Sequence, residues 1–175
     1  NACGAKVDYK VPKGDTHPRA VCPACGHIQY QNPKVVVGSV PVWEDRILLC
    51  RRAIEPRHGK WTLPAGYMEN NETAPEGAAR EAMEEANARI DVEQLYTLFS
   101  VPHISQVYVL FRARLLDLDF SPGEESLEVK LVREDEIPWD ELAFACVRRT
   151  LAHFFEDRRT GMYLPRFGEI RPPER

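Results

Sequence analysis

Three glutamates lie close together near the middle of the chain. Glu81, Glu84 and Glu85 fall within the stretch EAMEEA, where the other residues are alanine and methionine. If this stretch is helical, residues three and four apart share a face, so the three carboxylates project to the same side and repel one another. Grouped carboxylate oxygens are the ligands that Mg²⁺ and Mn²⁺ prefer. The spacing therefore predicts a divalent metal site, and the alternative is a solvated acidic helix face.

Cysteines near the start of the sequence form a second group of candidate ligands. Cys3 and Cys25 are each followed by glycine, which permits the tight turn of a zinc knuckle, and Cys22 completes a Cys-x-x-Cys pair with Cys25. Two knuckles normally supply four thiolates, so the pattern calls for one more cysteine three positions before Cys3, just outside the given sequence. We expect a structural Zn²⁺ site. A chance grouping, and a fourth ligand from His17 or His27, stay open as alternatives.

A helix must carry the three glutamates, and the sequence indicates where it begins. Thr73 followed by Glu76 is the pattern of a capping box, and Pro75 fits the first helical turn, where its missing N–H costs little. We expect a helix between about residues 73 and 88, packed on a sheet by its small and apolar side chains. The side chains predicted to face the sheet are Ala79, Ala82, Met83 and Ala86.

Apolar, β-branched runs indicate the sheet on which this helix would pack. The runs predicted as strands are 35–43, 46–52, 94–101, 106–116 and 127–132. A second helix is expected within 139–158, and a strand-rich core with helices before and after the later strands predicts an α+β layered domain. Cys50 and Cys146 lie alone in apolar runs, so we interpret them as buried thiols.

Charge is distributed unevenly along the chain. The whole sequence has a net charge of −4, whereas residues 1–34 carry five Lys or Arg and two Asp, which leaves the remainder acidic. An acidic body disfavours nonspecific nucleic-acid binding, which requires phosphate neutralisation. There is neither an apolar run of the roughly 20 residues that a membrane-spanning helix needs nor the layout of a signal peptide. We therefore expect a soluble, cytoplasmic protein that does not bind membranes.

Residues 66–88, GYMENNETAPEGAAREAMEEANA, resemble the Nudix box. That motif has fixed glycine, glutamate and Arg-Glu positions followed by a Glu-Glu pair, and the matching residues are Gly66, Glu72, Arg80, Glu81, Glu84 and Glu85. Asn87 stands where the family has glycine, and Ala82 and Ala88 are smaller than the usual aliphatic residues. Because asparagine is the next-best residue at a left-handed helix end, we expect the turn to be retained.

The resemblance implies a fold, a domain layout and a reaction. The family fold is an α/β/α sandwich around a mixed sheet, which places the Nudix domain at 33–160, after a zinc-ribbon-like segment at 1–32 that is incomplete at its N-terminus. A C-terminal tail would occupy 161–175. Family members use Mg²⁺ or Mn²⁺ to hydrolyse the P–O–P bond of a nucleoside diphosphate linked to another group.

The resemblance also assigns roles to individual residues. The three box glutamates would bind the metal, together with the backbone carbonyl near Gly66, and Arg80 would pair with Glu72 to brace the loop against the helix. The general base would be Glu81 or a glutamate of the later stretch SPGEESLE, where Glu125 is the first candidate and Glu124 and Glu128 are its neighbours.

Substrate contacts are less clearly indicated. The candidates are Arg51, Arg52, Trp61 and His103, with core packing as the alternative for the tryptophan. ADP-ribose or FAD is the favoured substrate, giving AMP and a phosphorylated moiety. An N-terminal zinc ribbon is also similar to that of NADH pyrophosphatases, but their Pro-Trp-Phe-Pro motif is replaced here by SVPHISQVYVLF.

Two further functions stay open at the level of the sequence. One is the hydrolysis of damaged nucleoside triphosphates by a housecleaning enzyme. The second is an inactive Nudix domain that serves as a nucleotide sensor or as a nucleic-acid-binding regulator. The resemblance also implies a homodimer, because related pyrophosphatases complete their pockets in that way.

Overall fold

The computed structural model describes residues 3–172, and the chain divides into two compact units, 1–33 and 34–175. The first unit is a small antiparallel sheet in the order β1-β2-β3. Its strands are β1 (Asp8–Lys10), β2 (Arg19–Val21) and β3 (Ile28–Gln29). The turn between β2 and β3 is closed by the amide of Cys22, which donates to the carbonyl of His27 at 2.8 Å. This unit is therefore held together by short strands.

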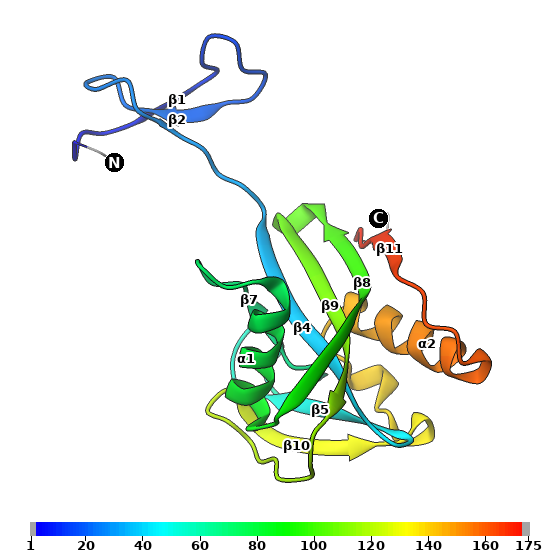
Figure 1. Cartoon of the computed structure of the whole chain (residues 1–175). Helices are drawn as coiled ribbons and strands as arrows, with labels where there is room; N and C mark the ends of the chain where they lie inside the picture. The colour runs from blue at the N-terminus through cyan, green and yellow to red at the C-terminus, as the bar shows by residue number, and fades with distance from the viewer. Residues whose placement is uncertain (1–2, 173–175) are drawn as a thin grey trace. The chain divides into compact units, whose positions relative to one another are not determined.

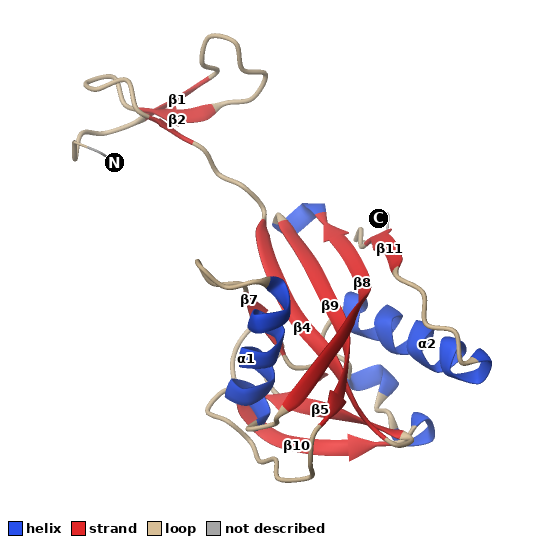
Figure 2. Cartoon of the chain, in the orientation of Figure 1, coloured by secondary structure: helices blue, strands red, loops and turns tan. Residues whose placement is uncertain are grey.

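The second unit is built on one mixed sheet (Figure 2). Its strands follow the order β10-β5-β4-β9-β8-β11, while β6 pairs with β5 and β7 pairs with β4. The central pair β4 and β9 is parallel, and most other neighbours are antiparallel. The strands are β4 (Lys34–Trp43), β5 (Arg46–Arg52), β6 (Trp61–Thr62), β7 (Ala65–Tyr67), β8 (Ile90–Val101), β9 (Gln106–Leu115), β10 (Ser126–Val132) and β11 (Arg166–Glu169).

One long helix covers each face of this sheet: α1 (Ala74–Ala86) and α2 (Ala145–Thr160) (Figure 1). Alternation along β4 sends Val36 and Val40 into a core that contains Leu151 of α2, whereas Val37 approaches Gly77 of α1 on the opposite face. Within the described residues, three short 3₁₀ helices complete the unit: Pro102–Ile104, Glu134–Glu136 and Trp139–Glu141. The predicted α+β sandwich around a mixed sheet is confirmed.

The second helix begins later than the sequence indicates. The stretch predicted to contain this helix begins at residue 139, but α2 starts at Ala145. Leu142 instead forms a parallel bridge with Trp61, and the amide of Ala143 donates to the Trp61 carbonyl at 2.8 Å. The backbone before the helix therefore forms hydrogen bonds with the short strand β6 instead of extending α2.

The C-terminal segment differs from the tail expected for 161–175. Arg166–Glu169 form β11, which pairs in parallel with β8, and Ile170 is buried beyond it. Residues 173–175 of the expected tail lie outside the described residues. Within residues 3–172, none of the helices combines the length and the apolar character needed to cross a membrane.

Candidate metal and catalytic site

Both ends of α1 are fixed by capping interactions. The hydroxyl of Thr73 accepts from the amide of Glu76 at 3.4 Å, and the Glu76 carboxylate accepts from the Thr73 amide at 2.7 Å, so the predicted capping box is confirmed. At the other end Asn87 adopts the left-handed conformation, with φ 46° and ψ 29°. The helix that carries the acidic residues therefore has the limits that the sequence indicates, to within about two residues.

The face that α1 buries agrees only in part with the prediction, since Ala82 and Ala86 are buried as expected. Met83 is predicted to face the sheet, but 42% of it is exposed, and Ala79 is only partly buried. The buried residues of α1 are Gly77, Ala78, Glu81, Ala82, Glu85 and Ala86. Residues without bulk at 77 and 78 let the helix approach β4 closely, since a Cβ on Gly77 would lie 2.7 Å from Val37 Cγ2. As a result, two of the three glutamates are turned inward.

The inward glutamates lie against the backbone of β7. The amide of Ala65 donates to Glu85 Oε2 at 3.2 Å. A Cβ added to Gly66 would lie 2.4 Å from each carboxylate oxygen of Glu81, so any side chain at this position would displace that carboxylate. Glu84 is the outward member of the group, with a side chain that is 57% exposed. The three carboxylates therefore lie along one side of α1, from the interior to the surface, although among the described residues their oxygen atoms do not converge as closely as the sulfur atoms of the N-terminal cysteines.

Arg80 links the loop before α1 to the carboxylates on it. Its guanidinium donates to both carboxylate oxygens of Glu72, at 2.8 and 3.0 Å, which confirms the predicted pairing. Its Nη1 donates at 2.8 Å to Glu81 and also to Glu84, and Nη2 donates to the Tyr67 carbonyl at 3.1 Å. The Arg80 guanidinium holds the pKa of Glu72 down at about 2, so this pair stays charged over the physiological range.

Burial shapes the proton affinities of the two inward glutamates. It raises the pKa of Glu85 to about 8, and the Ala65 amide opposes this rise while the charge of Glu81 adds to it. The pKa of Glu81 is also raised by burial, against the opposing effect of Arg80 and with contributions from the negative charges of Glu84 and Glu125. Clustered, desolvated carboxylates of this kind are characteristic of cation sites, because a bound cation offsets the cost of ionising them.

The loop after β9 carries Glu125, whose charge acts on Glu81 and Glu85. The amide of Gly123 donates to the Glu85 carbonyl at 3.0 Å, and a Cβ on Gly123 would overlap the Glu84 carbonyl, so the loop lies directly on the end of α1. Glu125 follows two residues later, and its carbonyl accepts from the Ala53 amide at 2.8 Å. The sequence prediction of the site omits Gly123, although the glycine in SPGEES indicates a close approach of the backbone.

The predicted substrate contacts are spread over different environments. Arg52 is only 8% exposed, donates from Nε to the Pro56 carbonyl at 2.8 Å and stacks over the Phe144 ring. Arg51 is more accessible and donates to the Gly59 carbonyl at 3.0 Å. Trp61 is buried in the core that contains α2, which agrees with a packing role. His103 lies exposed in the 3₁₀ helix after β8, where its side chain contacts no described carboxylate of the site.

The N-terminal cysteines form a compact cluster. The sulfur atoms of Cys3, Cys22 and Cys25 all lie within 4.8 Å of one another, and the Cys3 and Cys22 sulfurs are 3.4 Å apart. A hydrogen bond from the Cys25 backbone and one from the Cys3 side chain lower the pKa of Cys22 to about 7, which favours the thiolate. Three converging thiolates fit Zn²⁺. Among the described residues, His17 and His27 do not join this cluster.

The two other cysteines are buried, as the apolar runs around them indicate. Burial raises the pKa of both Cys50 and Cys146, so each thiol stays protonated. Cys50 lies behind α1, in a small core with Ala86 and Ala88.

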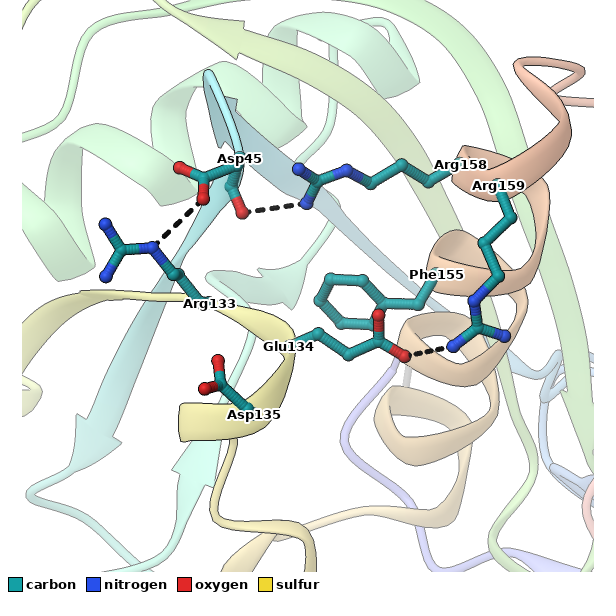
Figure 3. A pocket seen from close by; sticks show the side chains of 7 residues that line it. All are labelled: Asp45, Arg133, Glu134, Asp135, Phe155, Arg158 and Arg159. Atoms are coloured by element: carbon teal, nitrogen blue, oxygen red, sulfur yellow. Dashed lines mark hydrogen bonds and ion pairs between the residues drawn. The ribbon is translucent and has the colours of Figure 1, made fainter.

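A separate surface cleft of about 370 Å³ shares no residue with the acidic site (Figure 3). The residues that line it are Asp45, Arg133, Glu134, Asp135, Phe155, Arg158 and Arg159. Its arginines are already engaged: Arg133 and Arg158 bind the side chain and the carbonyl of Asp45, and Arg159 pairs with Glu134 (Figure 3). These contacts join the β4–β5 turn to α2, and among the described lining residues every arginine already has a partner that would compete with a phosphate.

Comparison with protein families gives a match to each unit. A model described as the NUDIX domain matches residues 32–154, and one described as Nudix N-terminal, a zinc ribbon, matches residues 1–31. A MutT-like protein of Streptomyces ambofaciens is 35% identical over 104 residues, 59% of this chain and 66% of that protein. An ADP-ribose pyrophosphatase of Methanocaldococcus jannaschii is 27% identical over 121 residues, 66% of this chain and 69% of that protein. The chain thus spans about two thirds of these relatives.

Solved structures extend the similarity to nearly the whole chain. A NUDIX hydrolase from Nitrosomonas europaea has a TM-score of 0.94 and 58% identity, and the match covers 96% of both chains. An ADP-ribose pyrophosphatase from Streptococcus suis has a TM-score of 0.62 and 22% identity over 78% of this chain and 99% of that one, which is a likeness of fold. Because the family model spans most of the sequence, and Arg80 joins Glu72, Glu81 and Glu84 of the box, this chain belongs to the Nudix hydrolase family and carries the Nudix N-terminal zinc ribbon.

Proposed function

We propose that the protein hydrolyses the P–O–P bond of a nucleoside diphosphate linked to another group, with Mg²⁺ or Mn²⁺ as cofactor. ADP-ribose and FAD are the favoured substrates, and either would give AMP and a phosphorylated second product. The observation that supports this most strongly is the placement of Glu81 and Glu85, two desolvated carboxylates held against β7, beside the exposed Glu84. The proteins of Methanocaldococcus jannaschii and Streptococcus suis to which this chain is similar are both named ADP-ribose pyrophosphatases.

The metal would be held by the carboxylates of Glu81, Glu84 and Glu85, with the backbone carbonyl near Gly66. The donor set is all oxygen, as Mg²⁺ and Mn²⁺ prefer, and the raised pKa of Glu85 means that a cation would have to compete with a proton there. When bound, the ion neutralises the diphosphate and stabilises the charge that develops during phosphoryl transfer. Arg80 stays anchored to Glu72 on one side and keeps the loop and helix in register.

A carboxylate of the same site would take the proton from the attacking water. Glu81 and Glu125 are the two candidates, because both lie at the acidic cluster and the charge of Glu125 acts on Glu81. A base works best when its pKa is near the working pH, and the pKa of Glu81 is shifted upward by burial, in the direction that this role requires. Glu124 and Glu128 are weaker candidates, since the main charges that act on Glu81 and Glu85 do not include theirs and Glu128 lies 3.8 Å from Arg51.

Among the predicted substrate contacts, Arg51 is the best placed to meet a phosphate. Its guanidinium is 42% exposed at the end of β5, whereas that of Arg52 is buried against Pro56 and Phe144. We assign Arg52 to shaping the wall of the site near Glu85, where its charge partly offsets the rise in the pKa of that carboxylate. Trp61 would support this wall from the core, and His103 would contact only the distal part of a long substrate.

A panel of substrates tests the proposal. ADP-ribose, FAD, NADH and nucleoside triphosphates would be incubated with the protein and Mg²⁺ or Mn²⁺, and the products identified by chromatography. Release of AMP from ADP-ribose or FAD is expected. Release of pyrophosphate from triphosphates alone would instead place the protein among triphosphate housecleaning enzymes, and no turnover of any substrate would favour a nucleotide-binding role.

A further inference from the structure

The residue that follows α1 departs from the Nudix motif in this chain. Asn87 occupies the position that is glycine in the motif, and it takes the left-handed conformation that ends α1. Its backbone N–H donates to the Met83 carbonyl at 2.8 Å, so the backbone completes the helix end as that of a glycine would. The asparagine therefore adds something that the cap itself does not require, and that addition is its side chain.

The side chain of Asn87 reaches the loop that follows β9. Its Nδ2 lies 3.1 Å from the Ser121 carbonyl, 3.2 Å from the Ser121 hydroxyl and 3.3 Å from the Pro122 carbonyl. Two backbone bonds lie beside these contacts, from the Ser121 amide to the Ala86 carbonyl and from the Gly123 amide to the Glu85 carbonyl, both at 3.0 Å. The loop is thus joined to the end of α1 by side-chain and backbone contacts together.

The same loop carries Glu125 only two residues beyond Gly123. The Ser126 amide donates to the Gly123 carbonyl at 3.1 Å, which folds the intervening residues into a tight turn. On the far side, the Glu125 carbonyl accepts from Ala53, at the end of β5. With β10 starting at Ser126, the position of Glu125 depends on how firmly the preceding residues are held at α1.

We propose that Asn87 is a positioning residue for Glu125: its side-chain amide fastens the 121–123 segment to the end of α1 and so sets the Glu125 carboxylate against the acidic site. Glycine at position 87 would cap the helix equally well but would leave the segment held by its backbone bonds alone. Each residue freed in this way gains conformational entropy, so Glu125 would spend less time in its working position. This inference rests on the proposed function, because it assumes that Glu125 takes part in the reaction.

The test is a double-mutant cycle on the Mg²⁺-loaded full chain with the best diphosphate-linked substrate. Asn87→Gly is expected to lower kcat by about tenfold with little change in KM, which corresponds to about 1.4 kcal/mol. In the Glu125→Gln background, the same substitution should cause no further loss, because its effect passes through Glu125. The matched control is Asn71→Gly, a second left-handed asparagine (φ 70°) whose side chain makes no described hydrogen bond, and it should leave kcat unchanged.

A second readout does not depend on turnover. Hydrogen exchange of the Gly123 and Ser126 amides should become faster in Asn87→Gly, whereas that of the Ala65 amide, which is bonded to Glu85, should stay as in the wild type. Unchanged kcat and unchanged loop exchange in Asn87→Gly would overturn the proposal. It would also be overturned if Asn87→Gly lowered kcat by the same factor in the wild-type and in the Glu125→Gln background. Failure of the proposed function would look different, because wild-type protein would then release no AMP from any diphosphate-linked substrate.

Discussion

At the scale of single residues, the central feature is that two carboxylates are buried where a hydrophobic contact would ordinarily lie. Glu81 and Glu85 take places on the inward face of α1, beside Ala78 and Ala82. Burial of an ionised group is costly, so in the absence of a cation each carboxylate holds its proton more tightly than in water. The site is therefore ready for a cation, at a cost in stability when the cation is absent.

The cost of burying Glu85 predicts how the stability of the protein depends on pH. The folded pKa of Glu85 is about 8, above its ordinary value of 4.5, so its contribution to stability is complete below pH 4.5 and is lost as the pH rises toward 8. Without added divalent metal, the free energy of unfolding of the wild type should therefore fall across this window. Glu85→Gln, which keeps the size and removes the titration, should flatten this fall. Urea denaturation at several pH values gives the slope of the free energy of unfolding against pH for each protein. Equal slopes for the wild type and Glu85→Gln would contradict the expected protonation of Glu85.

At the scale of elements, the site depends on how closely α1 and β7 approach each other. Gly66 allows this approach, because any side chain at that position would overlap the Glu81 carboxylate. Residues that orient metal ligands from behind commonly affect metal affinity about 10- to 100-fold. Gly66 would act in this way on Glu81, the proposed ligand whose carboxylate it faces.

Gly66→Ala should therefore weaken metal binding without unfolding the domain. The added methyl group displaces the Glu81 carboxylate, and Mn²⁺ affinity is expected to fall by about tenfold or more. Titration of Mn²⁺ followed by electron paramagnetic resonance measures the affinity, and circular dichroism checks that the variant is folded. Wild-type Mn²⁺ affinity in a folded Gly66→Ala variant would mean that Glu81 does not hold the metal.

The elements also show what the sequence could and could not predict. The box helix, its cap and the Arg80–Glu72 pair follow from local spacing, so they are accessible without a structure. The inward placement of Glu81 and Glu85 could not be predicted in this way. It is decided by the fit of Gly77 against Val37 rather than by the apolar residues of the helix itself. The late start of α2 depends likewise on a distant partner, Trp61, which captures the preceding backbone.

At the scale of the whole molecule, the C-terminal strand β11 forms one edge of the sheet, and an ion pair with a buried aspartate holds it there. Asp157 of α2 accepts from the Tyr96 hydroxyl at 2.7 Å and is paired with Arg166, the first residue of β11. A second pair, Arg171 with Glu169, lies exposed on the same segment. The pair of Asp157 with Arg166 could not be read from the sequence, because its partners meet only when β11 adds to the sheet.

These two ion pairs should differ in their contribution to stability. Arg166→Met leaves the buried Asp157 without its counter-charge and should lower the free energy of unfolding by about 2 kcal/mol. Arg171→Met removes an exposed pair of the same type and should have a much smaller effect, because water screens the charges. Chemical denaturation of the two variants gives the comparison. Equal losses would show that β11 is not held by the Asp157 contact.

The small N-terminal unit should depend on its metal. Its strands are short and its described core is little more than Val21 and Cys22, which is too small to fold stably without a cross-link or an ion. Chelation of zinc should therefore make residues 3–33 sensitive to a protease, while residues 34–172 resist cleavage. Limited proteolysis followed by mass spectrometry locates the cuts. Resistance of the N-terminal unit under chelation would exclude a zinc requirement for its fold.

The catalytic role of the acidic site is tested by AMP release from ADP-ribose by wild type and Glu84→Gln, each with and without Mg²⁺. Glu84 is the exposed member of the three proposed ligands, so its substitution removes one carboxylate charge at constant size and leaves the packing of α1 intact. We predict that wild-type turnover requires Mg²⁺ and that Glu84→Gln is slower by about a hundredfold or more, equivalent to about 2.7 kcal/mol. Metal-independent turnover, or a Glu84→Gln variant as fast as wild type, would contradict the assignment of this acidic site as the catalytic metal centre.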